Sequence, residues 1–159
     1  MKICVIGGGG AIGGYLATKL ARAGNQVTVV ARGATLDAIK QNGLTLFMEG
    51  EPRPLVARVK AVSKITDVET PDVVMLAVKA HQVEPIIDDL AKIMGPNTIL
   101  IPLQNGIPWW YFQKLPGKYQ DHPVETVDAG GVIMKKINPQ NILGCVVYPA
   151  TYTESPGVI

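Results

Sequence analysis

Six glycines fall within residues 5–17, VIGGGGAIGGYLA, and this stretch constrains the fold more than any other. The apolar run 3–6 precedes the glycines and is typical of a strand buried on both faces. After the glycines, apolar residues recur every four positions over 12–20, which predicts an amphipathic helix ending at Gly24. A spacing of Gly8-x-Gly10-x-x-Gly13 between a strand and a helix predicts a phosphate-binding turn.

Each glycine of this spacing has its own physical role. Gly8 allows a tight turn, Gly10 lets the backbone approach a pyrophosphate, and Gly13 lets the helix pack close to the strand. The helix N-terminus would then present free N–H groups and a partial positive charge to the phosphates.

A secretion signal and a flexible linker are the two other interpretations of the same stretch. Four consecutive glycines would weaken the apolar helix of a signal by about 1 kcal/mol per residue relative to alanine. The uncharged stretch is also shorter than the ~20 residues of a membrane span. Strongly periodic apolar segments flank the glycines closely, which argues against a linker.

Strands and helices alternate along the rest of the chain. Apolar runs at 26–32, 72–79 and 97–103 predict three more strands, and the patterns at 34–43 and 82–95 predict helices, the latter with Pro85 in its first turn. This alternation predicts one domain over 1–159, an α/β fold with a doubly wound, Rossmann-like parallel sheet. We also expect a hairpin or two edge strands within 44–62, a short helix over 107–115 and one or two strands within 141–154.

Composition excludes several kinds of site. The net charge is +2 and the basic residues are scattered, whereas nucleic acid or an anionic membrane would require a basic patch. Cys4 and Cys145 lie far apart in apolar runs, which predicts buried thiols in a reducing compartment, the cytoplasm. His81 and His122 have no partner at ligand spacing, so we expect no metal site.

Folds of this class bind ligands at the carboxyl ends of their strands. NAD-binding domains usually place an acidic residue at the end of the second strand to hold the ribose hydroxyls. Here that position is Arg32, and no acidic residue precedes Asp37. A guanidinium pairs well with a 2′-phosphate, so the sequence favours NADP(H). The alternative is a solvated surface arginine.

Further polar residues follow the third and fourth apolar strands. Lys79 closes the third strand, with Gln82 three residues on, and Asn105 and Gly106 follow the fourth. Each alone is compatible with an ordinary loop, but together they predict contacts with phosphate, ribose or nicotinamide. The aromatic run 109–112 is either a ligand-stacking platform or packed structure, and the packed alternative is favoured.

Several segments of the chain resemble those of a known protein family. The segments KICVIGGGGAIGGYLATKLARAG, VVARG, AVKAHQ and LQNG are similar to the N-terminal domain of the ketopantoate reductases (2-dehydropantoate 2-reductases), and 144–159 looks like the strands closing that domain. The resemblance implies NADPH-dependent reduction of 2-dehydropantoate, a small 2-oxo acid, to pantoate in pantothenate biosynthesis. It also implies which residues bind the cofactor: Gly8, Gly9, Gly10, Ala11, Ile12 and Gly13 at the pyrophosphate, Arg32 at the 2′-phosphate, Lys79, Gln82, Asn105 and Gly106 further along, and Ala150 at the nicotinamide end.

Two departures from the family pattern affect these expectations. One extra glycine, Gly7, stands between the strand and the turn. Family members also carry a second, helical domain that supplies the lysine acting as general acid, and Ile159 lies where that domain should begin. The chain is then either a piece of a longer protein or naturally short, and we expect it to bind cofactor without turnover. The apolar seam expected there would favour self-association, such as a homodimer.

Two other functions remain open. One is a non-enzymatic nucleotide-sensing module of the same fold, although such modules usually carry an acid where Arg32 stands. The other is a related NADP-dependent reductase of another 2-oxo acid.

Overall fold

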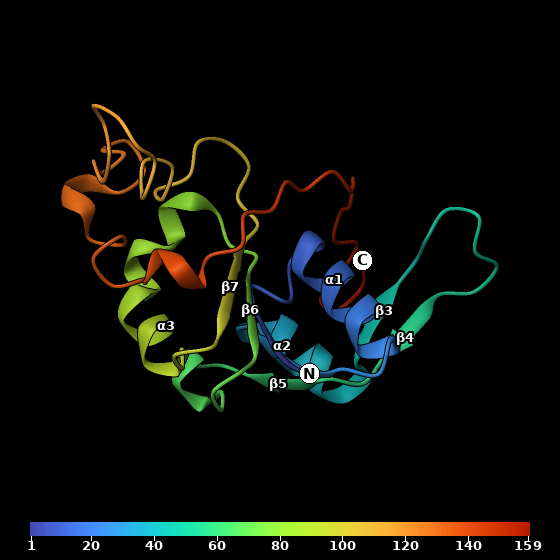
Figure 1. Ribbon diagram of the computed structural model, residues 1–159. Coiled ribbons are helices and arrows are strands. Elements are labelled where there is room, and N and C mark those ends of the chain that lie inside the picture. The colour runs from blue at the N-terminus through green and yellow to red at the C-terminus, as the bar shows by residue number, and fades with distance from the viewer.

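A five-stranded parallel sheet forms the centre of the computed structural model, which describes residues 1–159 (Figure 1). The strand order is β5-β2-β1-β6-β7, and all neighbouring pairs are parallel, as predicted. The chain winds outward from β1 in both directions, so the order reverses between β1 and β6. The strands are β1 (Lys2–Ile6), β2 (Gln26–Val30), β5 (Lys60–Val62), β6 (Val73–Leu76) and β7 (Ile99–Pro102).

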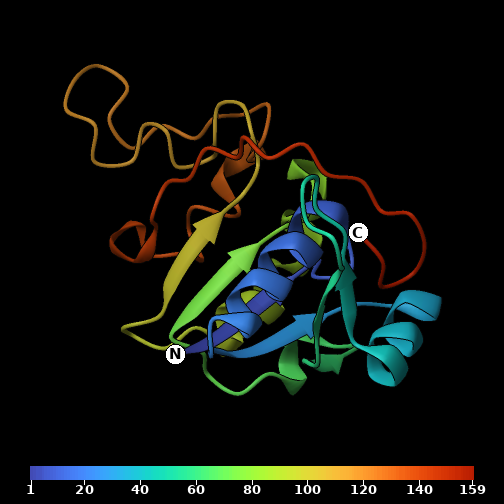
Figure 2. The same cartoon turned by 90° about the vertical axis from the view of Figure 1, so that its right-hand side faces the viewer.

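Helices cover both faces of this sheet. The helices α1 (Ala11–Arg22) and α2 (Gly33–Asn42) contribute to the core on one face, and α3 (Ile87–Ile93) packs on the other (Figure 2). The chain also forms five short 3₁₀ helices: η1 (Ile65–Asp67), η2 (Ala80–Gln82), η3 (Glu84–Ile86), η4 (Ala129–Gly131) and η5 (Pro139–Asn141). The helix predicted over 82–95 is therefore shorter, with Pro85 in the 3₁₀ turn η3 that precedes α3.

The predicted hairpin lies beside α1. It consists of the antiparallel strands β3 (Leu44–Leu46) and β4 (Leu55–Ala57). The chain end joins it, since the N–H of Ile159 donates to the Thr45 carbonyl and the N–H of Phe47 to the Ile159 carbonyl. The side chain of Ile159 packs where a Cβ at Gly14 would lie, which fixes the chain end against α1.

Two hydrophobic cores lie on the two faces of the sheet. Alternation along β1 explains them, because Ile3 and Val5 belong to the core under α1 and α2, whereas Cys4 and Ile6 belong to the core under α3. The strand is thus buried on both faces, as its uniform apolar run predicts.

The short helix expected over 107–115 is not present. The chain there forms consecutive turns, in which Tyr111 bonds to Pro108, Gln113 to Trp110 and Leu115 to Phe112, each through backbone groups three residues apart. Trp109 and Trp110 both pack against the core under α3. A helix would turn two adjacent side chains about 100° apart, so burying both favours the irregular path. The packed interpretation of the aromatic run is correct for these two residues.

The strands expected within 141–154 are also absent. The segment touches the sheet at a single bridge, where the Leu143 N–H donates to the Leu100 carbonyl. Two residues further along β7, Pro102 has no N–H to offer a neighbouring strand. We call residues 143–153 the strap, because they cross over the end of the sheet from α3 toward α1 (Figures 1 and 2). Cys145 lies in the strap and is exposed, so the expectation that both thiols are buried is correct only for Cys4.

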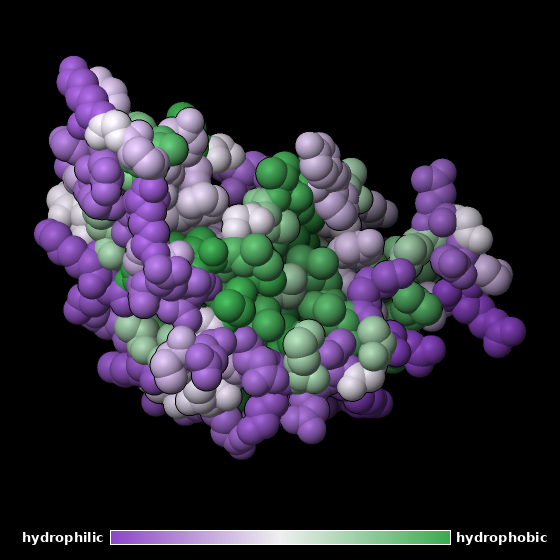
Figure 3. Space-filling view, viewed as in Figure 1, coloured by the Kyte–Doolittle hydropathy of each residue, from purple (hydrophilic) through white to green (hydrophobic).

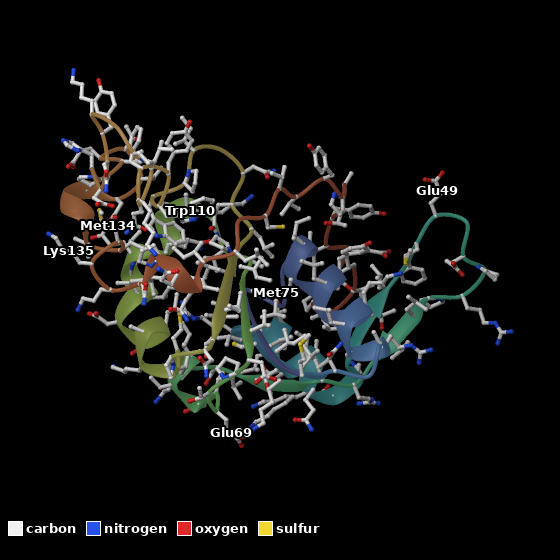
Figure 4. The ribbon with its side chains drawn as sticks, in the orientation of Figure 1. Glu49, Glu69, Met75, Trp110, Met134 and Lys135 are labelled. Atoms are coloured by element: carbon white, nitrogen blue, oxygen red, sulfur yellow. The ribbon has the colours of Figure 1, made fainter.

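On the face of the sheet that α1 and α2 cover, the part formed by β6 and β7 has no helix over it. Val73 and Met75 on β6 and Ile99 and Ile101 on β7 alternate with buried residues but are themselves only partly buried. A hydrophobic area fills the middle of the view in Figure 3, between α1 and β7, and Met75 lies there in Figure 4. None of the helices is both long and apolar enough to cross a bilayer.

Candidate functional site

A cavity of about 850 Å³ opens at the carboxyl ends of the parallel strands. It lies where the strand order reverses, between the ends of β1 and β6, which is the position at which doubly wound sheets bind ligands. The predicted site residues on its wall come from four separate segments of the chain: Gly9, Gly10, Ala11, Ile12, Arg32, Lys79, Gln82 and Asn105.

The extra glycine, Gly7, takes over the turn itself. Its φ is +82°, a left-handed conformation that favours glycine, and a Cβ there would lie 2.6 Å from the Ala77 carbonyl oxygen. Its carbonyl accepts from the Gly10 N–H at 3.0 Å, and its own N–H continues the β1–β2 pairing to Val30. Gly7 thus lies at the turn between the end of β1 and Gly10, the N-cap of α1.

The other glycines divide into two kinds. Gly8 and Gly13 are buried behind the turn, where a Cβ at Gly8 would lie 2.6 Å from Val29 and a Cβ at Gly13 would overlap the Gly7 carbonyl. Neither lines the cavity, so their role is packing. Gly10 is exposed on the wall, and a Cβ there would meet only the Gly7 oxygen, at 3.4 Å. The geometry thus leaves Gly10 as the point at which a ligand can approach the backbone.

The N-terminus of α1 faces this cavity. Gly10 is its N-cap without any side-chain cap, and the first turn contains no acidic residue. The first N–H groups of a helix lack intrahelical partners and carry partial positive charge. Nothing on the helix offsets that charge, so the terminus is suited to an anion.

Two cations complete the electrostatics of the wall. Arg32 follows β2 as the N-cap of α2, and Lys79 follows β6; both side chains are exposed and neither is within 4 Å of a carboxylate. No acidic side chain lines the cavity. The residues present therefore fit a ligand with several phosphates, such as a phosphorylated dinucleotide.

The amide side chains of Gln82 and Asn105, both predicted to contact the cofactor, form hydrogen bonds with the backbone. The Oε1 of Gln82 accepts from the Lys79 N–H at 2.9 Å. The Asn105 side chain pairs with the backbone of Val147 in the strap. Gly106 lines a smaller adjoining cavity of about 130 Å³, which Asn105 shares. Ala150 lines neither cavity, whereas its neighbours Pro149 and Thr151 are on the wall of the larger one.

Sequence reasoning missed three polar residues on the wall. Thr35 comes from α2, Thr151 from the strap and Gln104 from the chain just after β7. Gln104 precedes Asn105 at a strand end, and the rule that selected Asn105 applies equally to it. Buried oxygen atoms of Gln104 and Thr151 have no hydrogen-bond partner.

The remaining reactive side chains lie outside this site. His81 and His122 line neither cavity. No group of three metal-binding side chains occurs anywhere in the chain. Burial raises the pKa of the Cys4 thiol to about 12, which keeps it protonated and unreactive at neutral pH.

Comparison with known proteins identifies the family of the chain. The family model for ketopantoate reductase PanE/ApbA matches residues 3–159. A curated 2-dehydropantoate 2-reductase from Mesorhizobium japonicum is 46% identical over all of this chain and 48% of its own length. A crystal structure assigned as a ketopantoate reductase, from Ralstonia solanacearum, matches 98% of this chain and 47% of its own with 40% identity and a TM-score of 0.88. D-mandelate dehydrogenase with NADH and anilino(oxo)acetate follows at 26% identity and a TM-score of 0.72, over 99% of this chain and 44% of its own. The chain spans about half the length of these relatives.

Proposed function

The chain belongs to the ketopantoate reductase PanE/ApbA family, and from that premise we propose that it forms the NADPH-binding half of an enzyme that reduces 2-dehydropantoate to pantoate. The observation that carries the proposal is the cavity wall, which combines an uncapped helix N-terminus with two unpaired cations and has no carboxylate. A non-enzymatic module that binds NADPH would use the same cations, so the family match is what favours the enzyme.

The residues on the wall suggest how the cofactor would lie. The backbone from Gly9 to Ile12 would hold the pyrophosphate at the start of α1. Arg32 would pair with the 2′-phosphate at the end of β2, and Lys79 and Asn105 would lie toward the nicotinamide. When bound, the nicotinamide supplies a hydride to the keto carbon of the substrate.

We assign to Lys79 the stabilisation of the charge that develops on the keto oxygen. It is the only ammonium on the cavity wall. A second, helical domain, location in a reducing compartment and assembly into a homodimer remain predictions from the sequence.

A second candidate is an enzyme that handles another 2-oxo acid with NADH. D-mandelate dehydrogenase, a structural neighbour at 26% identity, is described with NADH and a 2-oxo acid analogue. Arg32 argues for the phosphorylated cofactor, because a hydrogen bond between charged groups contributes roughly 1.5–3 kcal/mol.

Calorimetric titration of the chain with NADPH and with NADH tests the proposal. We expect NADPH to bind about 10- to 100-fold more tightly, and Arg32→Ala to remove most of that difference. Arg53→Ala is the matched control, because Arg53 is exposed and does not line the cavity. Equal dissociation constants would overturn the NADPH assignment, and no binding of either nucleotide would overturn the cofactor site.

A further inference from the structure

The peptide unit between Val78 and Lys79 is held at both ends by glutamine side chains. Its carbonyl, that of Val78, accepts from Nε2 of Gln104 at 2.7 Å. Its N–H, that of Lys79, donates to Oε1 of Gln82 at 2.9 Å. This peptide is the last unit before the only ammonium on the cavity wall.

The side chain of Gln104 replaces a missing backbone hydrogen bond of the sheet. Leu103 donates its N–H to the Leu76 carbonyl, and in a continued parallel ladder the N–H of Asn105 would donate to Val78. The chain leaves the sheet after β7, and Nε2 of Gln104 supplies the missing bond to the Val78 carbonyl at 2.7 Å. The same nitrogen is a second donor to the Leu76 carbonyl, also at 2.7 Å. Because both acceptors are carbonyls, the amide can stand in only one orientation, with its NH₂ group toward β6.

The opposite side of the same segment is held by the end of β1. The Ala77 N–H donates to the Ile6 carbonyl at 2.8 Å, and the Ala77 carbonyl oxygen lies close to Gly7, 2.6 Å from where a Cβ would be. Residues 77–79 are thus held from the β1 side by the Ile6 carbonyl and from the β7 side by Gln104. A flexible surface loop would not need bonds on both sides.

We infer that Gln82 and Gln104 are positioning residues for Lys79: together they fix the Val78–Lys79 peptide so that the ammonium lies against the bound cofactor. This inference rests on the proposed function for what Lys79 contacts, and on the hydrogen bonds alone for how Lys79 is held. The sequence predicted direct cofactor contact for Gln82. In the structure its Oε1 instead accepts the hydrogen bond from the Lys79 N–H.

A double-mutant cycle on NADPH affinity tests the inference. We expect Gln104→Leu and Gln82→Leu each to weaken NADPH binding by about ten-fold, the equivalent of one net hydrogen bond. In a Lys79→Met background, both substitutions should have almost no further effect, because the group they position is gone. Equal weakening in both backgrounds, or none in the Lys79 protein, would overturn the inference.

Gln113→Leu is the matched control. Gln113 also donates to a backbone carbonyl, that of Met134, and also has a buried Oε1 without a partner, but it lies outside the cavity. It should leave NADPH affinity unchanged. If Gln104→Leu does not fold, Gln104→Asn keeps the amide on a side chain too short to reach both carbonyls.

Amide hydrogen exchange at Lys79 separates this inference from the proposed function. The Gln82→Leu and Gln104→Leu variants should exchange the Lys79 N–H about ten-fold faster without any nucleotide present. Faster exchange in a chain that does not bind NADPH would support the clamp, that is, the hydrogen bonds of Gln82 and Gln104 to the Val78–Lys79 peptide, and would refute the cofactor assignment. Unchanged exchange in both variants would refute the clamp whatever the nucleotide does.

Discussion

Asn105 holds both backbone groups of Val147. Its Oδ1 accepts from the Val147 N–H and its Nδ2 donates to the Val147 carbonyl, each at 3.3 Å. One side chain therefore does what a neighbouring strand would do, and it ties the strap to the edge of the cavity. Elsewhere in the strap, Val146 and Tyr148 are exposed, at 68% and 88%.

Replacing Asn105 should release the strap. We expect Asn105→Leu to speed amide exchange at Val147 by about 10- to 100-fold, since two hydrogen bonds contribute roughly 1–3 kcal/mol together. Exchange measured by NMR or mass spectrometry checks this. Asn138→Ala is the control, because the Asn138 side chain accepts only from the N–H of Gln140, nearby in the chain. Unchanged exchange at Val147 would show that the pair does not hold the strap in solution.

Gly10 and Gly13 should respond in opposite ways to an added side chain. Gly10→Val places its side chain in the cavity and should abolish nucleotide binding, at a cost to stability of no more than about 1 kcal/mol. Gly13→Ala drives a methyl group into the Gly7 carbonyl and should destabilise the fold by about 1–3 kcal/mol. Thermal unfolding and NADPH fluorescence measure the two effects. A Gly10→Val chain that binds with unchanged affinity would contradict the assignment of the turn.

The two thiols should differ in reactivity. Cys145 is exposed and should react with a disulfide reagent in the folded chain, whereas Cys4 is buried, with a pKa raised to about 12. We expect one reactive thiol in buffer and two in denaturant, and none in buffer for Cys145→Ser. The folded pKa of Cys4 exceeds the ordinary value of 9.0, so the stability linked to it should be lost as pH rises from 9 toward 12. Two rapidly reacting thiols in buffer would refute the burial of Cys4.

The strands and helices that could be predicted are those whose burial is local and regular. The runs that became β1 and β2 are largely buried on both faces, those that became β6 and β7 have one buried and one partly buried apolar face, and Gly43 ends α2 with a φ of +80°. The position of the cavity followed from the strand order, since strand ends meet at one edge of a parallel sheet.

The elements that could not be predicted depend on contacts distant in the chain. The strap forms no strand because Pro102 interrupts the edge of β7 and the Asn105 side chain takes the Val147 backbone. The segment 107–115 forms turns because two adjacent tryptophans pack on one core. Gln82 and Gln104 are polar residues at strand ends, and no pattern distinguishes a side chain that meets a ligand from one that holds the backbone beside it.

The uncovered sheet face should bind hydrophobic molecules. Met75 of β6 and Ile101 of β7 are partly exposed residues of this face, and Met75 lies within the hydrophobic area (Figures 3 and 4). We expect the chain to enhance the fluorescence of anilinonaphthalene sulfonate, and Met75→Thr with Ile101→Thr to remove most of that signal. Leu115→Thr is the control, because Leu115 is exposed at 47% away from this face. A signal that survives the double substitution would place the dye elsewhere.

The chain of 159 residues should bind NADPH without rapid turnover. Arg32 and Lys79 are the only titratable side chains on the cavity wall, and we assign Arg32 to the 2′-phosphate and Lys79 to the developing charge on the keto oxygen. That leaves no separate proton donor, and a positioned acid contributes about 10²- to 10⁴-fold to the rate. Mixing the chain with NADPH and 2-dehydropantoate while following absorbance measures this. We expect binding with oxidation far below the ~1 s⁻¹ that is common for enzymes. Substrate-dependent oxidation at that rate would show that Lys79, or His81 or His122 after a rearrangement, donates the proton, and the Lys79→Met variant would distinguish between them.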